Sequence, residues 1–182
     1  MLNLAIGQGE NTQTLMNMVR LYQMLASDGK SRTPYLVRPT SEPQYDFNLT
    51  PEQLASLRQA MINVVEQGTA RGARLADLKI AGKTGTAQNS QGLNHGWFIG
   101  FAPVDNPQIV VGAVLEFGRH GTVAAPIVAR IIAHYLGADT TAAAYRFILP
   151  NDSTPTPADN RLLGAPPADS LPVDSTSAPE IP

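Results

Sequence analysis

The change in composition after about residue 138 constrains this chain most, because it limits how much of the chain can fold. No aromatic residue follows Phe147 in the 182-residue sequence, and seven prolines fall between residues 151 and 182 among Ala, Ser, Thr and Asp. Such a segment cannot bury enough apolar surface to offset the loss of chain entropy. We therefore predict a folded domain over residues 1–138 and a linker with a disordered, Pro/Ala/Ser/Thr-rich tail over residues 139–182.

Charge and cysteine content exclude several classes of function. The formal net charge is -2, and the 13 Lys and Arg residues are scattered, so there is no basic surface for nucleic acid. The chain has no cysteine, which excludes disulfides, thiolate nucleophiles and cysteine-ligated zinc. The first residues lack a basic segment and a long apolar run, so we predict neither a signal peptide nor a membrane anchor in this chain.

Three windows repeat apolar residues at intervals of three and four, the spacing of one helical face. The windows comprise Leu15, Met18, Val19, Tyr22, Leu25 and Ala26, then Leu54, Leu57, Met61, Val64 and Val65, then Ile127, Val128, Ile131, Ile132, Tyr135 and Leu136. Each pattern predicts a helix that packs its apolar face on a core.

Capping signals mark where these helices begin. Asn11 or Thr12 can cap the first helix. Thr50 can cap the second, where Gln53 completes a capping box after a proline at the first helical position. Pro126 opens the third helix.

Three strands are predicted between the second and third helices, over residues 78–88, 97–102 and 109–117. The last two are rich in aromatic or β-branched residues and are bounded by Gly, Asn or Pro. Short connections favour antiparallel neighbours. The order of elements predicts an α+β fold, with an antiparallel sheet flanked by helices.

One strand carries the residues with the clearest chemistry, in the sequence Lys83-Thr84-Gly85-Thr86. Side chains alternate along a strand, so the two threonine hydroxyls share a face and can donate to a carboxylate, while the lysine supplies positive charge. Gly85 leaves the backbone open to a ligand. The four residues alone are a weak signal, because short motifs recur by chance and a glycine in a strand often marks a bulge.

Longer stretches around this motif resemble class B penicillin-binding proteins. They are Ile6-Gly-Gln-Gly-Glu10, Val64-Val-Glu-Gln-Gly-Thr-Ala70, Ala81-Gly-Lys-Thr-Gly-Thr-Ala-Gln88 and Gly96-Trp-Phe-Ile-Gly-Phe-Ala-Pro103. They occur in the order of that family and cover about residues 4–137. The resemblance identifies the chain as the C-terminal half of a transpeptidase domain, with an incomplete fold like that of penicillin-binding proteins and serine β-lactamases.

The resemblance also implies an activity and roles for individual residues. The activity is serine acyl transfer at the D-Ala-D-Ala end of peptidoglycan stem peptides, with β-lactams as further ligands. Lys83 would support the proton relay, and the Thr86 backbone N–H would supply half of an oxyanion hole. Substrate would bind at Thr84, Gly85 and Thr86. His95 and Trp97 would border the cleft, although a core role is the stronger expectation for Trp97.

The nucleophile of that family is not found in this sequence. Ser27-Asp28-Gly29-Lys30 matches S-x-x-K formally, but it falls at a predicted helix end, and it follows rather than precedes the Gly-Gln-Gly stretch. No S-x-N or Y-x-N occurs before Lys83. We therefore expect this chain to be inactive alone, because the groups of such a site act as a unit.

Metal and cofactor chemistry is not expected. His95, His120 and His134 lack the spacing of metal ligands, and the sequence offers no cofactor motif.

The resemblance implies peptidoglycan stem peptides, β-lactams, the missing N-terminal half of the domain and a cell-wall glycosyltransferase as partners. The parent protein would be anchored in the bacterial cytoplasmic membrane, with this domain on the periplasmic side. The alternatives are a non-catalytic module that binds wall peptides or a partner protein, and a relative of D,D-carboxypeptidases or serine β-lactamases.

Overall fold

The computed structural model describes residues 6–37 and 45–138. The predicted linker and tail therefore lie outside the described residues. The elements, in chain order, are α2 (Leu15–Ala26), α3 (Pro51–Glu66), η1 (Arg71–Ala73), β1 (Ala81–Ala87), β2 (His95–Ala102), β3 (Ile109–Leu115), η2 (Gly121–Val123) and α4 (Ala124–Leu136). The predicted α+β class, an antiparallel sheet flanked by helices, is confirmed.

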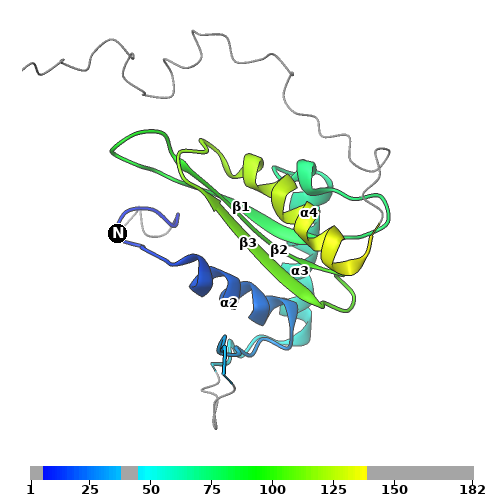
Figure 1. Cartoon of the computed structure of the whole chain (residues 1–182). Coiled ribbons are helices and arrows are strands. Elements are labelled where there is room, and N and C mark those ends of the chain that lie inside the picture. Colours follow the sequence, from blue (N-terminus) through cyan, green and yellow to red (C-terminus); the bar gives the residue numbers. More distant parts are fainter. Residues whose placement is uncertain (1–5, 38–44, 139–182) are drawn as a thin grey trace, which may run out of the picture. The chain divides into compact units, whose positions relative to one another are not determined.

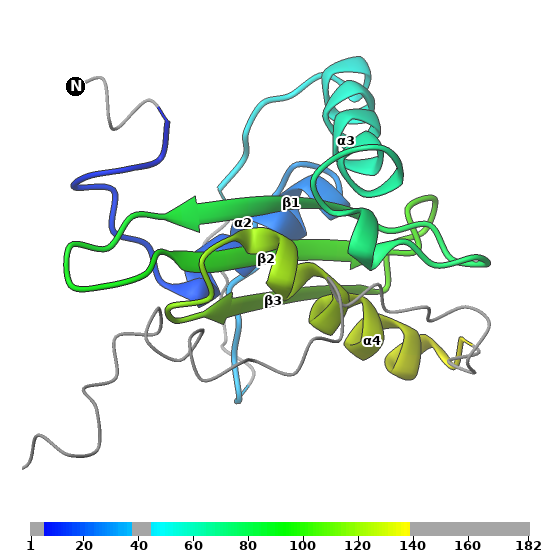
Figure 2. The same cartoon turned by 90° about the horizontal axis from the view of Figure 1, so that it is seen from above.

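The three strands form an antiparallel sheet in the order β1-β2-β3 (Figure 2). Thr84 of β1 faces Phe98 of β2, and Phe98 faces Ala113 of β3. Among the described residues, the outer edges of β1 and β3 have no strand partner. The outer edge of β1 is the edge that carries the Lys-Thr-Gly-Thr sequence.

Helices cover both faces of the sheet. Figure 1 shows α4 over one face and α2 over the other, and Figure 2 shows α3 on the β1 side. The core on the α4 face includes Val65, Ile80, Phe98, Val128 and Ile132, all at most 1% exposed. A second cluster, made of Tyr22, Ala26, Met61, Ala81, Ile99, Phe101 and Val104, lies on the α2 face. Alternate residues of β2 therefore enter opposite cores, as the two-residue repeat of a strand requires.

The start of α3 matches the prediction, and the start of α2 does not. Thr50 accepts a hydrogen bond from the Gln53 N–H, and the Gln53 side chain accepts one from the Thr50 N–H, which completes the capping box. The cap of α2 is Thr14, whose hydroxyl accepts from the Asn17 N–H, and neither Asn11 nor Thr12 has that role. Several polar residues precede this helix, so the sequence left its first turn ambiguous.

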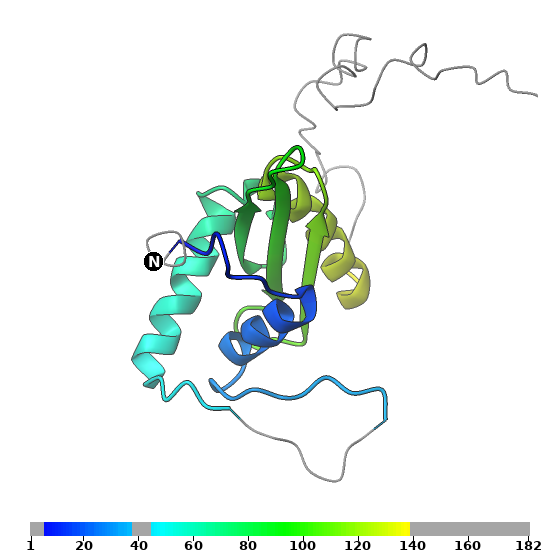
Figure 3. The same ribbon diagram turned by 90° about the vertical axis from the view of Figure 1, so that its left-hand side faces the viewer.

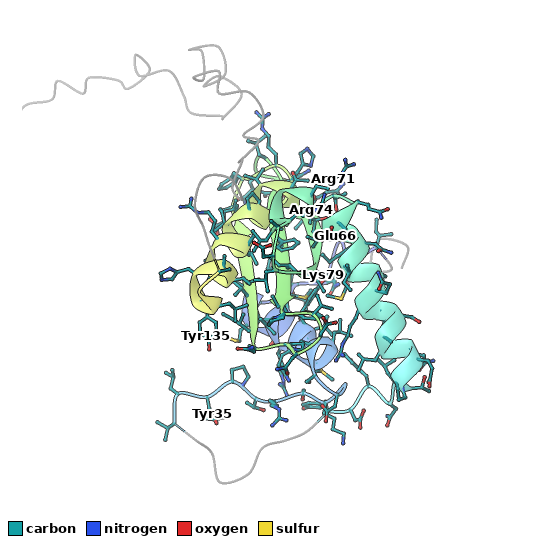
Figure 4. All side chains as sticks on the ribbon, turned by 90° about the vertical axis from the view of Figure 1, so that its right-hand side faces the viewer. Tyr35, Glu66, Arg71, Arg74, Lys79 and Tyr135 are labelled. Carbon is teal, nitrogen blue, oxygen red and sulfur yellow. The ribbon has the colours of Figure 1, made fainter. Side chains whose placement is uncertain are left out.

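The predicted apolar faces are only partly buried. Val128 and Ile132 of α4 are fully buried, but Ile127, Ile131 and Tyr135 are 38%, 46% and 63% exposed. Tyr135 extends away from the sheet in Figure 4. On α4 the small residues Ala124, Ala125, Ala129 and Ala133 take the remaining core positions. Close approach of the helix backbone to the sheet through alanines leaves the outer half of the apolar stripe partly exposed.

The strand boundaries differ from the prediction by a few residues. β1 runs from Ala81 to Ala87 and β3 from Ile109 to Leu115, so both are shorter than predicted, whereas β2 begins earlier, at His95. Pairing of β1 with β2 runs from Ala81↔Phe101 to Ala87↔His95. Pairing with the neighbouring strand therefore sets these limits, whereas apolar composition continues beyond them.

Burial of Tyr22 predicts a loss of stability at high pH. Desolvation raises the pKa of Tyr22 from 10.0 to about 12. The unfolded chain ionises near pH 10 while the folded chain does not, so this contribution is complete below pH 10 and is lost as pH rises toward 12. The expected loss is about 2–3 kcal/mol in the free energy of unfolding.

Urea unfolding from pH 8 to pH 12 measures this dependence, and Tyr22→Phe is the control. The variant should lose less stability than the unmodified chain over the same range. Equal losses in both proteins would show that exposed tyrosines and lysines produce the whole effect.

Candidate functional site

The Lys-Thr-Gly-Thr sequence forms one wall of a cavity beside β1. Lys83 and Gly85 face the α2 side of the sheet, because they pair with Ile99 and Trp97 of β2. The cavity has a volume of about 280 Å³. Its walls come from the segment before α2 (Ile6, Gly7, Asn11 and Gln13), from α2 (Met18 and Tyr22), from β1 (Lys83, Thr84, Gly85, Thr86 and Ala87) and from β2 (Trp97 and Ile99).

Three parts of the chain that are distant in sequence therefore meet at this cavity. In Figure 3 the segment that precedes α2 crosses the end of the sheet from the β1 side to the β3 side. Five consecutive residues of β1, with the backbone edge beside them, line the space enclosed in this way. An unpaired strand edge of this kind can bind an extended peptide through its backbone groups.

The polar groups of the motif already have partners within the chain. The Lys83 Nζ donates to the Thr84 carbonyl at 2.9 Å, so the ammonium lies along the outer edge of β1. The Thr84 Oγ1 lies 2.6 Å from the Thr69 Oγ1. When Thr69 donates in this pair, the proton of the Thr84 hydroxyl is free for a carboxylate bound along the outer edge of β1.

Thr69 also contacts the motif, and the sequence patterns did not predict it as a site residue. It stands in the loop after α3, where two arginine side chains make contacts within the loop and to the end of the helix. Arg74 pairs with Glu66 at 3.1 Å, and Arg71 donates to the Gly68 carbonyl at 3.3 Å (Figure 4). The sequence offered one signal for Thr69, which is that it belongs to the Val64–Ala70 stretch. Its contact with Thr84, 15 residues later, depends on the conformation of the loop.

His95 and Trp97 have different positions relative to the cavity. The Nδ1 of His95 accepts the Phe117 N–H at 3.1 Å, and the two rings pack edge to face at 5.3 Å. His95 is not among the cavity walls, whereas Trp97 is, and Trp97 also packs in the core on the α2 face. The Trp97 indole N–H is buried without a hydrogen-bond acceptor among the described residues.

Ser27 lies elsewhere, at the end of α2. It is the C-cap of the helix, and its hydroxyl donates to the Gln23 carbonyl at 2.9 Å. Its carbonyl accepts from the Arg58 guanidinium. Ser27 lines a separate cavity of about 460 Å³ between α2 and the start of β3, which none of the Lys83–Thr86 residues lines. The described structure therefore does not bring Ser27 to the site.

On the face of β1 opposite the cavity, glycines allow the chain around η2 to pack directly on the sheet. A Cβ on Gly121 would lie within 3.0 Å of backbone atoms of Gly85 and Trp97, and a Cβ on Gly96 would meet the His120 backbone. The start of η2 therefore lies directly on the backbone of the Gly85–Trp97 pair, on the face opposite the cavity. The Lys-Thr-Gly-Thr strand is held between this turn and the cavity.

Comparison with known proteins decides the family of this chain. The model of the penicillin binding protein transpeptidase domain matches residues 1–133. The chain belongs to this family. Its relatives include the class B proteins named MrdA, PbpA and PbpB.

Two curated relatives illustrate the similarity. The peptidoglycan D,D-transpeptidase MrdA of Acinetobacter baumannii is 33% identical, over 74% of this chain and 24% of its own length. The penicillin-binding protein PbpB of Mycolicibacterium smegmatis is 33% identical, over 69% of this chain and 24% of its length. The chain thus spans about a quarter of the length of these relatives.

Solved transpeptidase structures share the fold. Penicillin-binding protein A of M. tuberculosis, as the imipenem acyl-enzyme, matches with a TM-score of 0.65 and 28% identity over 74% of this chain and 33% of the solved one. Pseudomonas aeruginosa PBP2 matches with a TM-score of 0.62 and 32% identity, over 74% of this chain and 32% of the solved one. Helicobacter pylori PBP2 in complex with MreC matches with a TM-score of 0.64 and 28% identity, over 75% of this chain and 27% of the solved one.

Residues 6–37 and 45–138 contain neither a metal-binding cluster nor a membrane-spanning helix. No group of three His, Cys, Asp or Glu side chains there could hold a metal ion. None of the helices in those ranges has both the length and the hydropathy needed to cross a membrane.

Proposed function

We propose that this chain supplies the carboxylate-binding and oxyanion side of a peptidoglycan D,D-transpeptidase site. The observation that carries the proposal is the Lys-Thr-Gly-Thr sequence on an unpaired strand edge that borders a cavity of about 280 Å³. Residues 1–138 correspond, in this proposal, to the C-terminal half of the transpeptidase domain, and residues 139–182 to a linker and tail.

The chemistry of the cavity supports the roles of its residues. The hydroxyls of Thr84 and Thr86 bind the terminal carboxylate of a D-Ala-D-Ala peptide, assisted by the positive charge of Lys83. The Thr86 backbone N–H donates to the oxyanion that forms when a nucleophile attacks the scissile carbonyl. Thr69 orients the Thr84 hydroxyl through the 2.6 Å contact between their oxygens. Lys83 also supports the proton relay at the nucleophile.

The nucleophilic serine and its activating lysine come, in this proposal, from a part of the protein outside this chain. Ser27 caps α2 and lines a different cavity, which supports an external source. The DNA before the codon for Met1 provides a direct check. An in-frame S-x-x-K followed by S-x-N there is the expected result, and their absence would leave the site without a nucleophile.

Labelling with a fluorescent penicillin tests the function. The protein that includes the preceding segment should be labelled covalently, and the 182-residue chain alone should not. Thr84→Val in the longer protein should lower the labelling rate about tenfold, because it removes a hydrogen bond to a charged group at little change in shape. Thr122→Val is the matched control, since Thr122 is exposed and lies outside the cavity.

Labelling of the 182-residue chain itself would show that it contains its own nucleophile and would contradict the proposal. A second function remains open because the cavity is already formed in this chain. Saturable binding of a D-Ala-D-Ala peptide to the chain, without labelling of the longer protein, would indicate a wall-peptide binding module instead of an enzyme.

The cellular setting of the proposal follows the family. The whole protein would be anchored in the cytoplasmic membrane and would act at its periplasmic face. Peptidoglycan stem peptides and β-lactams would be its ligands. The solved complex of Helicobacter pylori PBP2 with MreC supports the proposal that the whole protein has a protein partner. A cell-wall glycosyltransferase is a further proposed partner, which rests on the family resemblance alone.

A further inference from the structure

The side chain of Gln8 is bound to the outer edge of β1. Its Nε2 donates to the Thr86 carbonyl at 2.7 Å, and its Oε1 accepts the Gln88 N–H at 3.1 Å. A carboxamide presents one acceptor beside one donor, as a peptide group does. It therefore occupies the position of a neighbouring strand for one pair of hydrogen bonds, at the end of the Lys-Thr-Gly-Thr sequence.

The residues on both sides of Gln8 are shaped for this contact. Gly7 and Gly9 both have a φ of +73°, a left-handed conformation that glycine adopts without steric cost. A Cβ at Gly7 would meet no atom within 4 Å, so at Gly7 the requirement is conformational and not a matter of space. The backbone turns before and after Gln8, and this double turn directs its half-buried side chain to β1.

The contact is made beside the backbone group that the proposed function uses. In an antiparallel strand the N–H and C=O of one residue point to the same edge, so the Thr86 N–H faces the same outer edge as the carbonyl that Gln8 binds. Gly85 precedes Thr86 and, although it pairs with Trp97 of β2, it has no side chain to narrow the backbone angles there. The two Gln8 hydrogen bonds supply, at residues 86 and 88, the restraint that Gly85 does not.

Other polar residues of the same segment do not share this role. Asn11 and Gln13 also line the cavity, but their side chains are hydrogen-bonded to each other at 3.1 Å. Within residues 6–37 and 45–138, Gln8 is thus the side chain of this segment that bonds to the backbone of β1 and of the residue after it.

We propose that Gln8 is a positioning residue of the transpeptidase site, which holds the end of β1 so that the Thr86 N–H points into the cavity. The inference rests on the proposed function of that N–H as an oxyanion donor. Gln8 touches neither the reacting atoms nor the carboxylate in this proposal. Its loss should therefore slow acylation while leaving ligand affinity nearly unchanged.

The kinetic test uses the longer protein that is labelled by penicillin. Gln8→Leu should lower the first-order acylation rate constant about tenfold, less than the loss of a whole oxyanion donor, with the dissociation constant of the initial complex changed less than about twofold. Gln59→Leu is the matched control, because Gln59 is exposed on α3. Equal acylation rates in Gln8→Leu and the unmodified protein would overturn the inference.

Gln8→Glu tests whether Gln8 acts through its two hydrogen bonds or only through the space that its side chain fills. The protonated carboxyl group of this variant can donate to the Thr86 carbonyl and accept the Gln88 N–H, whereas the ionised form only accepts and repels the carbonyl. Relative to the unmodified protein at the same pH, acylation by the variant should be nearly normal below about pH 4 and should fall as pH rises and the carboxyl ionises. A pH profile parallel to that of the unmodified protein would count against a hydrogen-bonding role.

Amide hydrogen exchange in the 182-residue chain tests the contact independently of the enzyme activity. Gln8→Leu should speed exchange at Gln88, whose N–H loses its acceptor, and Gln59→Leu should not. If the longer protein is never labelled by penicillin but this exchange result holds, the proposed function fails while the Gln8 contact stands. If labelling occurs and neither exchange nor acylation responds to Gln8→Leu, the positioning role fails alone.

Discussion

Replacing Gly121 by alanine is expected to destabilise the chain by about 3 kcal/mol, the upper end of the usual cost of overpacking. The added methyl group would approach Trp97 O and Gly85 O and would lie 2.9 Å from Gly85 N. All three are backbone atoms of paired strands, so no side-chain rotation can relieve the contact. The strand and the turn would have to move apart.

The movement would also disturb the cavity, because Gly121 packs behind the strand whose other face lines it. On the proposed function, binding of a D-Ala-D-Ala peptide should therefore weaken together with stability. Urea unfolding and peptide titration of the same samples measure both quantities.

Gly72→Ala is the control for this experiment. Its new methyl group would lie 3.6 Å from the Pro126 side chain, an ordinary contact, so a change below about 1 kcal/mol is expected. Equal midpoints for the two variants would show that η2 can shift without cost and that the packing of Gly121 on β1 is not important for stability.

The features that sequence reasoning predicted well are local ones. The capping box of α3 depends on residues 50 to 53, and the alternation of β1 depends on consecutive residues. These interactions need no knowledge of the rest of the fold. The position of the Lys-Thr-Gly-Thr sequence on a strand could therefore be predicted, with errors of a few residues at the strand ends. A cleft beside that strand was expected only from the family resemblance.

The features that could not be predicted from the sequence depend on contacts between distant segments. The Thr69–Thr84 contact spans 15 residues and the contacts of Gln8 span 78 and 80, so neither has a periodic signal. Periodicity also shows which side of a helix is apolar and not whether another element covers it. Ile131 and Tyr135 illustrate this limit, because they belong to the apolar stripe of α4 and remain 46% and 63% exposed.

Phe98 should be the most sensitive core position, since its replacement by alanine is expected to cost about 4 kcal/mol. The side chain is 0% exposed and lies in the core between the sheet and α4. Its ring occupies space that two glycines leave open, because a Cβ on Gly82 or Gly100 would come within 2.5 Å or 3.1 Å of ring atoms. Truncation would open a cavity beside Gly82, the residue before Lys83.

Phe47→Ala provides the comparison for Phe98→Ala, because Phe47 is 40% exposed and should lose about 1 kcal/mol or less on truncation. Urea midpoints of the two variants measure the difference. The larger loss at Phe98 should be accompanied by faster amide exchange at Lys83 and Gly85, whose N–H groups face β2 on either side of the Thr84–Phe98 pair. Equal losses at the two positions would mean that the core on the α4 face collapses around the missing ring, and that β1 does not depend on the ring for its position.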